Sequence, residues 1–464
     1  MLSFDLIIIG GGSGLNVADS VSQHGNKVAV IERGKLGGTC LNRGCIPSKL
    51  LLHSADVMEV IRKSHTFGIH VEKLTVDFKS IVERVNNIID DESNRLTRQF
   101  RRLTKVKLFS EESAFTGVKT ILLKSTGETL TAEKVLIAAG SRPLIPDIQG
   151  LSKSGYITSD EALRLTVQPK VLTIIGGGYI GCELAHFFGS LGTEINIVHN
   201  RRRLMRREDT EVSSKVTRIL SKKYNVYLNC ITDYISKDSN NKFHVNLKDS
   251  NDKKVELVSD QLLVAAGRTP NSDILNLEKT NVKIDDNGFV VTNEYLETNV
   301  PGIFALGDII GRYQFKHSAN LEAQYAYHNI VNPNHMAAVD YSGMPHAIFS
   351  SPQIAAVGST EQELRKKHIN FKKSVHKYID TGMGKAIEDN EGFVKFLVDA
   401  KEKKVLGCHI LGTEASILIH EVLPIMRLRN GADSRSINLI ARAIHIHPAL
   451  SEVVANAASK LAYQ

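Results

Sequence analysis

The sequence predicts an α/β fold divided into several domains, and three observations support this class. At 464 residues the chain is too long for a single hydrophobic core, so two to four domains are expected. Composition is ordinary for a globular protein, with 42% apolar and 23% charged residues. Two short apolar runs, residues 4–9 (FDLIII) and 171–175 (VLTII), each lead into a glycine-rich turn and a helical stretch. Uninterrupted apolar runs of this length are typical of buried parallel strands.

The first of these units continues from its strand through a glycine turn and a helix to a second strand that ends at Glu32. This order is the dinucleotide-binding fingerprint. Gly10 allows the tight turn, and Gly12 lets the backbone approach a pyrophosphate at the positive helix N-terminus. The Glu32 carboxylate can accept hydrogen bonds from ribose hydroxyls. Leu15 stands where the fingerprint has its third glycine, so we expect slightly wider helix–strand packing there, although Gly14 is adjacent.

The second unit repeats the pattern with all three glycines, Gly176, Gly178 and Gly181. Two such units in one chain are far more specific than one. They predict two Rossmann-like domains that bind two dinucleotides, or one nicotinamide dinucleotide and one FAD.

The second unit lacks an acidic residue at the position that corresponds to Glu32 in the first unit. Alignment of the two units on their helix-end glycines places His199 opposite Glu32, and arginines follow. They are Arg201, Arg202, Arg203, Arg206 and Arg207. A carboxylate at this place would repel a 2′-phosphate, whereas arginines bind one bidentately. We therefore expect the second site to bind a nicotinamide dinucleotide, NAD(H) or NADP(H), and to have room for the 2′-phosphate of NADP(H).

Several function classes are excluded by composition. The net charge is +8, but no aromatic-rich basic module accompanies it and Trp is absent, so no nucleic-acid partner is expected. No apolar run approaches the roughly 20 residues that span a bilayer. The start, MLSFDLIIIGGG, lacks the cationic region of a signal peptide. A cytoplasmic protein without a membrane partner is the expectation.

Two of the five cysteines, Cys40 and Cys45, lie close together in the segment GGTCLNRGCIPSK (37–49). A zinc site normally needs a second Cys/His cluster at ligand spacing, which the chain lacks, so no metal is expected. In a regular helix, five residues advance roughly 7.5 Å, beyond the reach of a disulfide. If the two cysteines bond, the helix start must be distorted, and Gly44 and Pro47 permit this. A strained bridge of this kind suits a redox pair better than a structural staple. The other three cysteines (Cys182, Cys230 and Cys408) are expected to pack, the last two in strands.

The same segment resembles the redox-active segment of the flavin-dependent pyridine nucleotide-disulfide oxidoreductases, and within that family it is most similar to dihydrolipoamide dehydrogenase. Further landmarks of the family follow in chain order over nearly the whole sequence. They are LIAAGSRP (136–143), LVAAGRTPN (263–271), TNVPGIFALGDI (298–309) and HIHPALSE (445–452).

This resemblance implies electron flow from the nicotinamide to FAD, to a Cys40–Cys45 disulfide and on to a thiol substrate. Cys45 would lie against the flavin and Cys40 would exchange with the substrate sulfur. Lys49 and Glu183 match the family's ion pair near the reactive nitrogen of the flavin. The remaining residues that the resemblance assigns to the cofactors are Gly38, Thr39, Gly140, Asp308 and Gly267.

A general acid–base must handle the thiol protons, and histidine suits neutral pH. His447 precedes Pro448, a residue that favours the first position of a helix, and this predicts a helix start there with Glu452 close enough to hydrogen-bond the imidazole. His445 should face the other way. In the family this histidine reaches the flavin of the partner subunit, so the resemblance implies a homodimer with a shared active site.

The predicted layout has four segments. The first part of the FAD domain covers 1–150, with an antiparallel excursion near 105–135 and a solvated helix near 79–104. The NAD(P) domain covers 151–270, the FAD domain resumes over 271–335, and a C-terminal α+β dimerisation domain covers 336–464. Dihydrolipoamide dehydrogenase, acting on a small dithiol or a lipoyl domain, is the favoured function. The alternative is an NADPH-dependent reductase of a small disulfide, similar to mycothione or glutathione reductase, because YQFKHSANLEAQ (313–324) resembles mycothione reductase.

Overall fold

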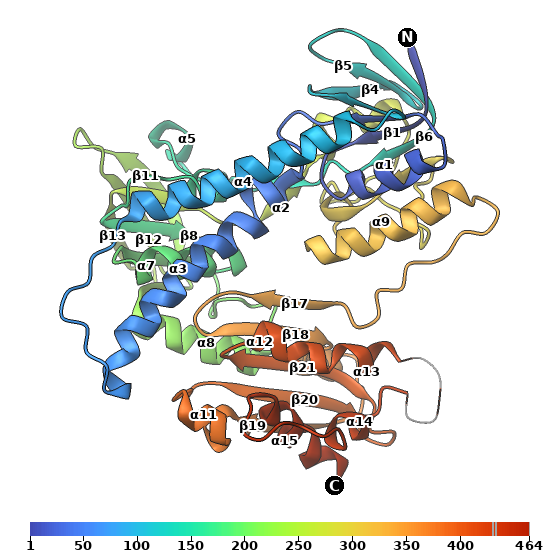
Figure 1. The fold of residues 1–464 in the computed structure, drawn as a ribbon. Coiled ribbons are helices and arrows are strands. Elements are labelled where there is room, and N and C mark those ends of the chain that lie inside the picture. Colours follow the sequence, from blue (N-terminus) through green and yellow to red (C-terminus); the bar gives the residue numbers. More distant parts are fainter. Residues whose placement is uncertain (429–430, 432–433, 464) are drawn as a thin grey trace.

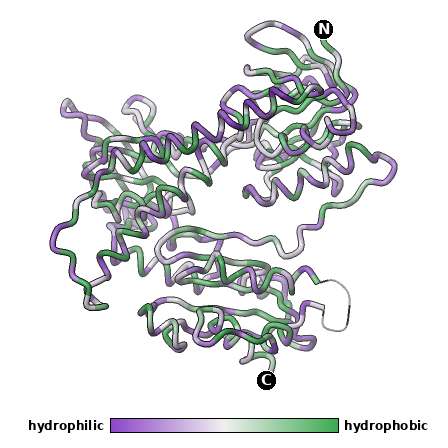
Figure 2. Tube along the Cα trace, in the orientation of Figure 1, coloured by the Kyte–Doolittle hydropathy of each residue, from purple (hydrophilic) through white to green (hydrophobic). Residues whose placement is uncertain are grey.

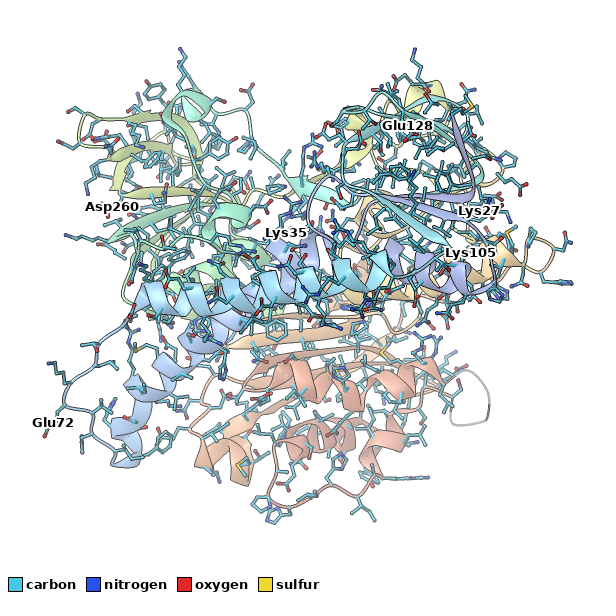
Figure 3. The ribbon with its side chains drawn as sticks, turned by 45° about the horizontal axis from the view of Figure 1, so that its top comes forward. Lys27, Lys35, Glu72, Lys105, Glu128 and Asp260 are labelled. Atoms are coloured by element: carbon cyan, nitrogen blue, oxygen red, sulfur yellow. The ribbon has the colours of Figure 1, made fainter. Side chains whose placement is uncertain are left out.

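The computed structural model describes residues 1–428, 431 and 434–463, and it arranges them around five sheets (Figure 1). Two of the sheets are mostly parallel and belong to the two nucleotide units, and an antiparallel sheet forms the C-terminal part. Charged side chains such as Lys27, Lys105 and Glu72 point away from the ribbon into solvent (Figure 3). Among the described helices, none has the length and apolar character needed to cross a bilayer.

The N-terminal sheet has the strand order β3-β2-β1-β6-β5-β4, with β16 added beside β6. Its strands are β1 (Leu2–Ile9), β2 (Val28–Ile31), β3 (Val106–Phe109), β4 (Ser113–Gly117), β5 (Thr120–Leu123), β6 (Thr129–Ile137) and β16 (Ile303–Ala305). The central strand β1 pairs in parallel with β2 and β6, and β2 pairs in parallel with β3. The predicted antiparallel excursion is therefore correct for β4 and β5, which form antiparallel pairs, and wrong for β3, which extends the parallel part.

Five helices belong to this part of the chain. They are α1 (Gly14–Gln23), α2 (Gly38–Arg43), α3 (Cys45–Lys63), α4 (Phe78–Arg101) and α9 (Lys316–Val331). Helices α1 and α9 pack against each other, and their apolar side chains share a core with β1 and β2. The predicted solvated helix is α4, which begins at an Asp77 cap and alternates hydrophilic and hydrophobic residues along its length (Figure 2).

The second nucleotide unit has a parallel sheet of order β10-β9-β8-β14 and an adjoining antiparallel sheet β11-β12-β13. Its elements are β8 (Val171–Ile175), β9 (Glu194–His199), β10 (Asn225–Leu228), β11 (Ile231–Lys237), β12 (Phe243–Lys248), β13 (Lys254–Ser259), β14 (Gln261–Val264), α5 (Leu151–Ser154), α6 (Ser159–Ala162), α7 (Tyr179–Ser190) and α8 (Thr210–Lys223). Helix α3 leaves the first unit and packs on α7 of the second. The rings of Phe78, Phe187 and Phe188 meet where α4 joins them, with centroids 4.9–5.8 Å apart.

Two short strands connect the two units. The chain leaves the first unit through β7 (Ser141–Pro143) and returns through β15 (Arg268–Pro270), and these two strands pair antiparallel. The segments expected to leave and re-enter the FAD domain thus lie side by side. The domain boundaries at 150, 270 and 335 stay predictions.

The C-terminal part is an antiparallel sheet of order β17-β18-β21-β20-β19 with helices beside it. Its elements are β17 (Pro345–Ile348), β18 (Gln353–Gly358), β19 (Phe371–Lys377), β20 (Phe393–Asp399), β21 (Val405–Gly412), α10 (Glu361–Lys366), α11 (Gly382–Ala386), α12 (Ala415–Leu418), α13 (Leu423–Arg427), α14 (Ile437–Ala441) and α15 (Ser451–Ala462). Short 3₁₀ turns complete the chain: η1 (Ser64–Phe67), η2 (Asn271–Ile274), η3 (Leu277–Lys279), η4 (Gly307–Ile310), η5 (Tyr378–Asp380) and η6 (Ile419–Glu421).

Candidate active site

The two glycine turns have the same local geometry. Gly10 and Gly176 have φ of 113° and 125°, and a Cβ on either would lie 2.2 or 2.1 Å from a backbone carbonyl oxygen. Both helices that follow, α1 and α7, begin without a side-chain cap on their first amides. The N–H groups at each helix start are therefore available to an anion. The donor set at both turns fits a dinucleotide diphosphate.

A hydrogen-bond acceptor holds each turn from the end of the neighbouring strand. Glu32 Oε2 accepts a 2.7 Å hydrogen bond from the Gly11 amide, and His199 Nδ1 accepts a 3.2 Å bond from the Gly177 amide. The predicted correspondence of His199 with Glu32 is confirmed by this contact. Burial lowers the pKa of His199, with Arg201 and Arg206 adding to the effect, so the imidazole is neutral at pH 7. The second turn thus has no negative charge where the first has one.

The missing third glycine of the first turn is replaced by its neighbour. A Cβ on Gly14 would lie 2.7 Å from Ile8 Cγ2, so Gly14 provides the close approach of helix and strand. Leu15 points into the core and is 3% exposed. In the second turn, Gly181 has this role, because its Cβ would lie 2.1 Å from the Gly176 carbonyl oxygen.

The arginines after His199 lie on a loop that is anchored at its centre. Leu204 and Met205 are buried, and the Met205 amide donates a 2.8 Å hydrogen bond to the Gly177 carbonyl at the turn. Arg201, Arg202, Arg206 and Arg207 are exposed, and within the described residues none of these four forms an ion pair with a carboxylate. The loop therefore presents uncompensated positive charge beside the second glycine turn.

The cysteine pair lies at a break between two helices. Cys40 is in α2 and Cys45 opens α3, with Gly44 between them at φ −146° and ψ −114°. The distortion that the spacing required is therefore present at Gly44. Both thiols are free in this structure. The backbones of Gly38 and Gly12 touch, because a Cβ on Gly38 would lie 2.8 Å from Gly12 Cα, and this contact places the pair beside the first glycine turn.

A hydrogen bond between the two thiols makes Cys45 the more acidic of the pair. The Cys40 thiol donates a hydrogen bond to Cys45, and this bond, aided by Lys49, lowers the pKa of the Cys45 thiol to about 7 against the opposing effect of burial. The same hydrogen bond, with burial, raises the pKa of the Cys40 thiol. Near neutral pH the pair therefore carries a thiolate at Cys45 and a thiol at Cys40. Among the described residues no group of His, Cys, Asp and Glu could hold a metal ion.

The ion pair expected between Lys49 and Glu183 is present. Lys49 Nζ lies 3.0 Å from both carboxylate oxygens, joining α3 to α7. Glu183 is buried and also accepts a 2.9 Å hydrogen bond from the Phe349 amide. The Phe349 ring lies 4.5 Å from Lys49 Nζ. Three parts of the chain therefore meet around this lysine.

The remaining residues assigned to the cofactors lie at the connection between the two units. Asp308 Oδ2 accepts a 2.6 Å hydrogen bond from Ser141 of β7. Gly140 and Gly267 both have positive φ at the ends of the paired connecting segments. Thr39 follows Gly38 at the contact with the first glycine turn. Gly140 and Asp308 follow β6 and β16, whose carboxyl ends lie beside that of β1, the strand that leads into the first glycine turn.

His447 and Glu452 form the predicted hydrogen bond, with 2.8 Å between Nδ1 and Oε1. This bond lowers the pKa of the Glu452 carboxyl. The His447 side chain is 78% exposed, whereas that of His445 is 14% exposed and bonds to Glu421, so the two histidines do face opposite ways. The predicted helix start at Pro448 is wrong, because α15 begins at Ser451. The chain first makes a turn in which the Ala449 amide donates a hydrogen bond to Glu452, and the helix begins after this turn.

The His447–Glu452 pair lies far from the cysteines of its own chain. Helix α15 is at the C-terminal end of the molecule and α2 is at the opposite side, between the two nucleotide units (Figure 1). The neighbouring Ile444 and Ile446 are exposed at 102% and 78%. Their segment is an apolar, outward-facing extension of the C-terminal sheet domain.

The other cysteines pack, as predicted. Cys182, Cys230 and Cys408 are all buried. Cys408 lies in β21, but Cys230 lies between β10 and β11, outside the strand expected for it.

Sequence reasoning missed a column of four stacked rings beside the site. It runs through Tyr179, His346, Phe315 and His317, with successive ring centroids 6.0, 5.7 and 5.4 Å apart. Tyr179 and His346 both donate to the buried Glu208, over 2.5 and 2.9 Å. The column joins the second glycine turn to β17 and to the start of α9. The only sequence sign of it was the YQFKHSANLEAQ segment.

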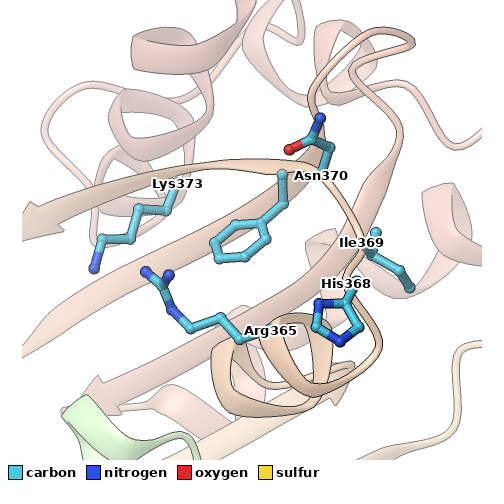
Figure 4. Close-up of a pocket in the computed structure, with 6 residues that line it drawn as sticks. Arg365, His368, Ile369, Asn370 and Lys373 are labelled. Atoms are coloured by element: carbon cyan, nitrogen blue, oxygen red, sulfur yellow. The ribbon is translucent and has the colours of Figure 1, made fainter.

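A separate depression of about 540 Å³ lies in the C-terminal domain (Figure 4). It is lined by Arg365, His368, Ile369, Asn370, Phe371 and Lys373. Its residues belong to α10, β19 and the turn between them, and none of the predicted site residues lines it.

Comparison with known proteins agrees with this arrangement. Residues 4–323 match the model of the pyridine nucleotide-disulphide oxidoreductase family, and residues 344–458 match its dimerisation domain. The chain is 35% identical to a mycothione reductase of Mycobacterium tuberculosis, covering 98% of this chain and 99% of the relative. It is 34% identical to a dihydrolipoyl dehydrogenase of Chlamydia pneumoniae, covering 98% and 96%.

Among solved structures, the Cu(II) complex of the HOCl-induced flavoprotein disulfide reductase RclA of Escherichia coli aligns with a TM-score of 0.87. The two sequences are 25% identical, and the alignment covers 99% of this chain and 100% of that one. The chain therefore belongs to the pyridine nucleotide-disulphide oxidoreductases, a family of FAD-dependent enzymes that also use a nicotinamide cofactor.

Proposed function

We propose that this protein is a homodimeric flavin-dependent reductase that uses NADPH to reduce a small disulfide through Cys40 and Cys45. The observation that carries the disulfide chemistry of this proposal is the cysteine pair, and the loop after β9 carries the choice of NADPH. The pair lies at a helix break beside the first glycine turn, and the hydrogen bond from the Cys40 thiol lowers the pKa of the Cys45 thiol to about 7. A structural pair has no use for a thiolate at neutral pH, and a metal site would need further ligands, which no cluster of His, Cys, Asp and Glu among the described residues supplies.

The reaction balances as one NADPH, one proton and one disulfide giving NADP⁺ and two thiols. Glu32, Gly12 and Asp308 would hold FAD at the first glycine turn, where the flavin would supply two-electron transfer between the nicotinamide and the Cys40–Cys45 disulfide. The Cys40 sulfur, once deprotonated, attacks the substrate disulfide, forms a mixed disulfide and releases the first thiolate, which takes up a proton. The Cys45 thiolate then attacks the Cys40 sulfur, restores the Cys40–Cys45 bond and releases the second thiolate, which is protonated in turn.

The raised pKa of Cys40 means that this exchange needs a base. The chain's own His447 lies on the far side of the molecule, so the base is assigned to His447 of the partner subunit. Its tautomer is set by Glu452, which accepts the hydrogen bond from Nδ1 and leaves Nε2 free to exchange protons. The exposed Ile444 and Ile446 supply apolar surface for the dimer contact.

NADPH is preferred in this proposal because of the loop after β9. The neutral His199 replaces the acid that would repel a 2′-phosphate, and four exposed arginines without ion-pair partners among the described residues lie beside it. Guanidinium groups in this position are suited to bidentate phosphate binding.

A second candidate, dihydrolipoamide dehydrogenase, is favoured by the redox segment GGTCLNRGCIPSK and by the His447–Glu452 pair. It would run the same chemistry in the opposite direction, from a dithiol to NAD⁺. The difference lies in the nicotinamide site and in the substrate, and not in the cysteine pair.

One set of assays tests both candidates. Reduction of a panel of small disulfides with NADPH is compared with oxidation of dihydrolipoamide with NAD⁺, and kcat/KM is measured for NADH and NADPH. The proposal expects NADPH-driven turnover of at least one disulfide. A strong preference for NADH with efficient dihydrolipoamide oxidation would replace it with the dehydrogenase.

A further inference from the structure

The arginine loop, residues 200–207 between β9 and α8, ends at a buried carboxylate that joins three parts of the chain. The loop contains no helix or strand, and Glu208 directly after it is 1% exposed. The Glu208 carboxylate accepts hydrogen bonds from the Tyr179 hydroxyl at 2.5 Å and from His346 Nε2 at 2.9 Å. Tyr179 follows Gly178 at the second glycine turn, and His346 belongs to β17 of the C-terminal sheet. Glu208 therefore connects the arginine loop to the turn and to the C-terminal domain.

A second side chain of the C-terminal domain holds the backbone beside Glu208. Gln362 of α10 donates a 2.9 Å hydrogen bond to the Glu208 carbonyl oxygen, and its own side-chain oxygen accepts a 3.1 Å bond from the Thr210 amide. One amide group thus bonds to the chain on both sides of Asp209. Helix α8, which follows, contacts β21 of the C-terminal sheet (Figure 1).

Asp209 itself is fully buried and binds to two helices and a lysine. Its carboxylate accepts 3.0 Å hydrogen bonds from the Glu211 amide at the start of α8 and from the Glu361 amide at the start of α10. Lys395 Nζ of β20, whose side chain is 1% exposed, lies 2.8 Å from Asp209 Oδ1. Separation of a buried ion pair leaves uncompensated charge and is costly. The end of the arginine loop is therefore fixed to the C-terminal domain.

The middle of the arginine loop is fixed to the second glycine turn, where the Met205 amide donates a 2.8 Å hydrogen bond to the Gly177 carbonyl. Arg206 and Arg207 lie between this anchor and Glu208, and both are exposed. A loop that is ordered before its ligand arrives loses less conformational entropy on binding. The two anchors therefore favour phosphate binding by the arginines that they hold in place.

We propose that the C-terminal domain sets the affinity of the second nucleotide site for a 2′-phosphate. Glu208 is the positioning residue, and His346 and Gln362 are the contacts through which the C-terminal domain acts on it. The inference rests on the proposed function, since it assumes that the arginine loop receives the 2′-phosphate of NADPH. The arginines bind the phosphate, and the C-terminal domain determines how well they are placed.

The test measures the binding of two probes to the flavin-loaded protein by calorimetry. Adenosine 2′,5′-bisphosphate carries the 2′-phosphate, and ADP lacks it. His346→Phe retains a ring for the stack with Tyr179 and Phe315 but loses the donor to Glu208, and Gln362→Ala loses both of its hydrogen bonds. A single hydrogen bond typically contributes enough to change a Kd by about 2- to 10-fold, so each variant should raise the Kd of the bisphosphate by that factor and leave the Kd of ADP unchanged.

Two further readouts separate positioning from a loss of structure. His346→Gln retains a donor nitrogen without the ring, and it should bind the bisphosphate like the parent. In turnover, His346→Phe and Gln362→Ala should raise KM for NADPH with kcat unchanged, because the cysteine pair and the flavin site are not altered. Urea unfolding midpoints identify a variant that is merely unstable, and Gln362 is partly exposed, so its substitution leaves no buried cavity.

A matched control is Gln168→Ala. Gln168 lies in the same domain as the arginine loop, and its amide donates hydrogen bonds to the Leu191 carbonyl at 3.0 Å and to the Thr193 hydroxyl at 3.2 Å. Its substitution removes a comparable pair of bonds away from the loop, so neither Kd should change.

The inference is overturned if Gln362→Ala or His346→Phe binds the bisphosphate with the parent's Kd, if both probes weaken equally, or if Gln168→Ala weakens the bisphosphate to the same extent. The proposed function fails at an earlier step, in the parent protein. A parent that binds the bisphosphate no more tightly than ADP has no 2′-phosphate site, and this result removes the choice of NADPH together with the inference.

Discussion

A methyl group at Gly178 should weaken nicotinamide binding without disturbing the fold, whereas one at Gly181 should disturb the fold itself. A Cβ built on Gly178 meets no protein atom within 4 Å, and its φ of −86° is open to any residue. At Gly181 the Cβ would lie 2.1 Å from the backbone oxygen of Gly176, which cannot yield without moving the turn. Overpacking of this kind typically costs about 1–3 kcal/mol.

The expected magnitude at Gly178 follows from the diphosphate contact. The helix-start amides border the open space beside Gly178, so the proposed nicotinamide dinucleotide would bind there, and a methyl group would block its close approach. A hydrogen bond to a charged group contributes about 1.5–3 kcal/mol, so the KM for the nicotinamide cofactor should rise about 10- to 100-fold.

The assay combines steady-state kinetics with urea unfolding. Gly178→Ala should keep its FAD content and its unfolding midpoint, and Gly181→Ala should lose stability. A Gly178→Ala enzyme with an unchanged KM for the nicotinamide cofactor would refute the assignment of this turn to the nicotinamide dinucleotide.

Three further outcomes are expected. Replacing Arg201 and Arg206 with Ala should lower kcat/KM for NADPH at least tenfold and leave kcat/KM for NADH unchanged, because each arginine–phosphate pair contributes about 1.5–3 kcal/mol. Equal losses of kcat/KM for both cofactors would contradict the assignment of these arginines to the 2′-phosphate. Since the pKa of the Cys45 thiol is lowered to about 7, the thiolate should be present above pH 7 and disappear as the pH falls through that value. The readout is the long-wavelength absorbance of the reduced enzyme, which should be lost with the thiolate. An absorbance band that persists well below pH 6 would be inconsistent with this pKa. His447→Gln should leave reduction of the flavin by nicotinamide intact and lower disulfide turnover by about 10²–10⁴-fold, which stopped-flow and steady-state assays separate; near-normal turnover would remove the base from the mechanism.

Much of the fold could be predicted because its central strands are buried on both faces. Such strands appear in a sequence as continuous apolar runs, so the run at 171–175 coincides with β8. The helix expected near 79–104 from its charge pattern is α4. The strand directions in the excursion expected near 105–135 were harder to predict. β3 pairs in parallel with β2, and strand direction depends on a partner distant in sequence that periodicity does not identify.

The site was predictable where the chemistry is local. Cys40, Cys45 and Gly44 lie within one segment, and the helix break expected for a bonded pair is found at Gly44. His447 and Glu452 are five residues apart and form the predicted hydrogen bond, although the helix start at Pro448 from which it was expected is wrong.

Contacts between distant elements could not be obtained in this way. The assignment of Lys49 and Glu183 came from the family resemblance, because in isolation Lys49 resembles a surface lysine and Glu183 an ordinary helix carboxylate. The hydrogen bond from Lys316 to Ser13 joins α9 to the first glycine turn, more than 300 residues away in sequence. The stacked rings of Tyr179, His346 and Phe315 likewise come from separate parts of the chain.

The number of electrons taken up by the enzyme tests the central claim most directly. Anaerobic dithionite titration of the flavin-loaded protein should consume four electrons per subunit, two for the flavin and two for the Cys40–Cys45 disulfide, with the thiolate band appearing after the first two. Uptake of only two electrons, with no such band, would contradict a redox-active pair at these positions.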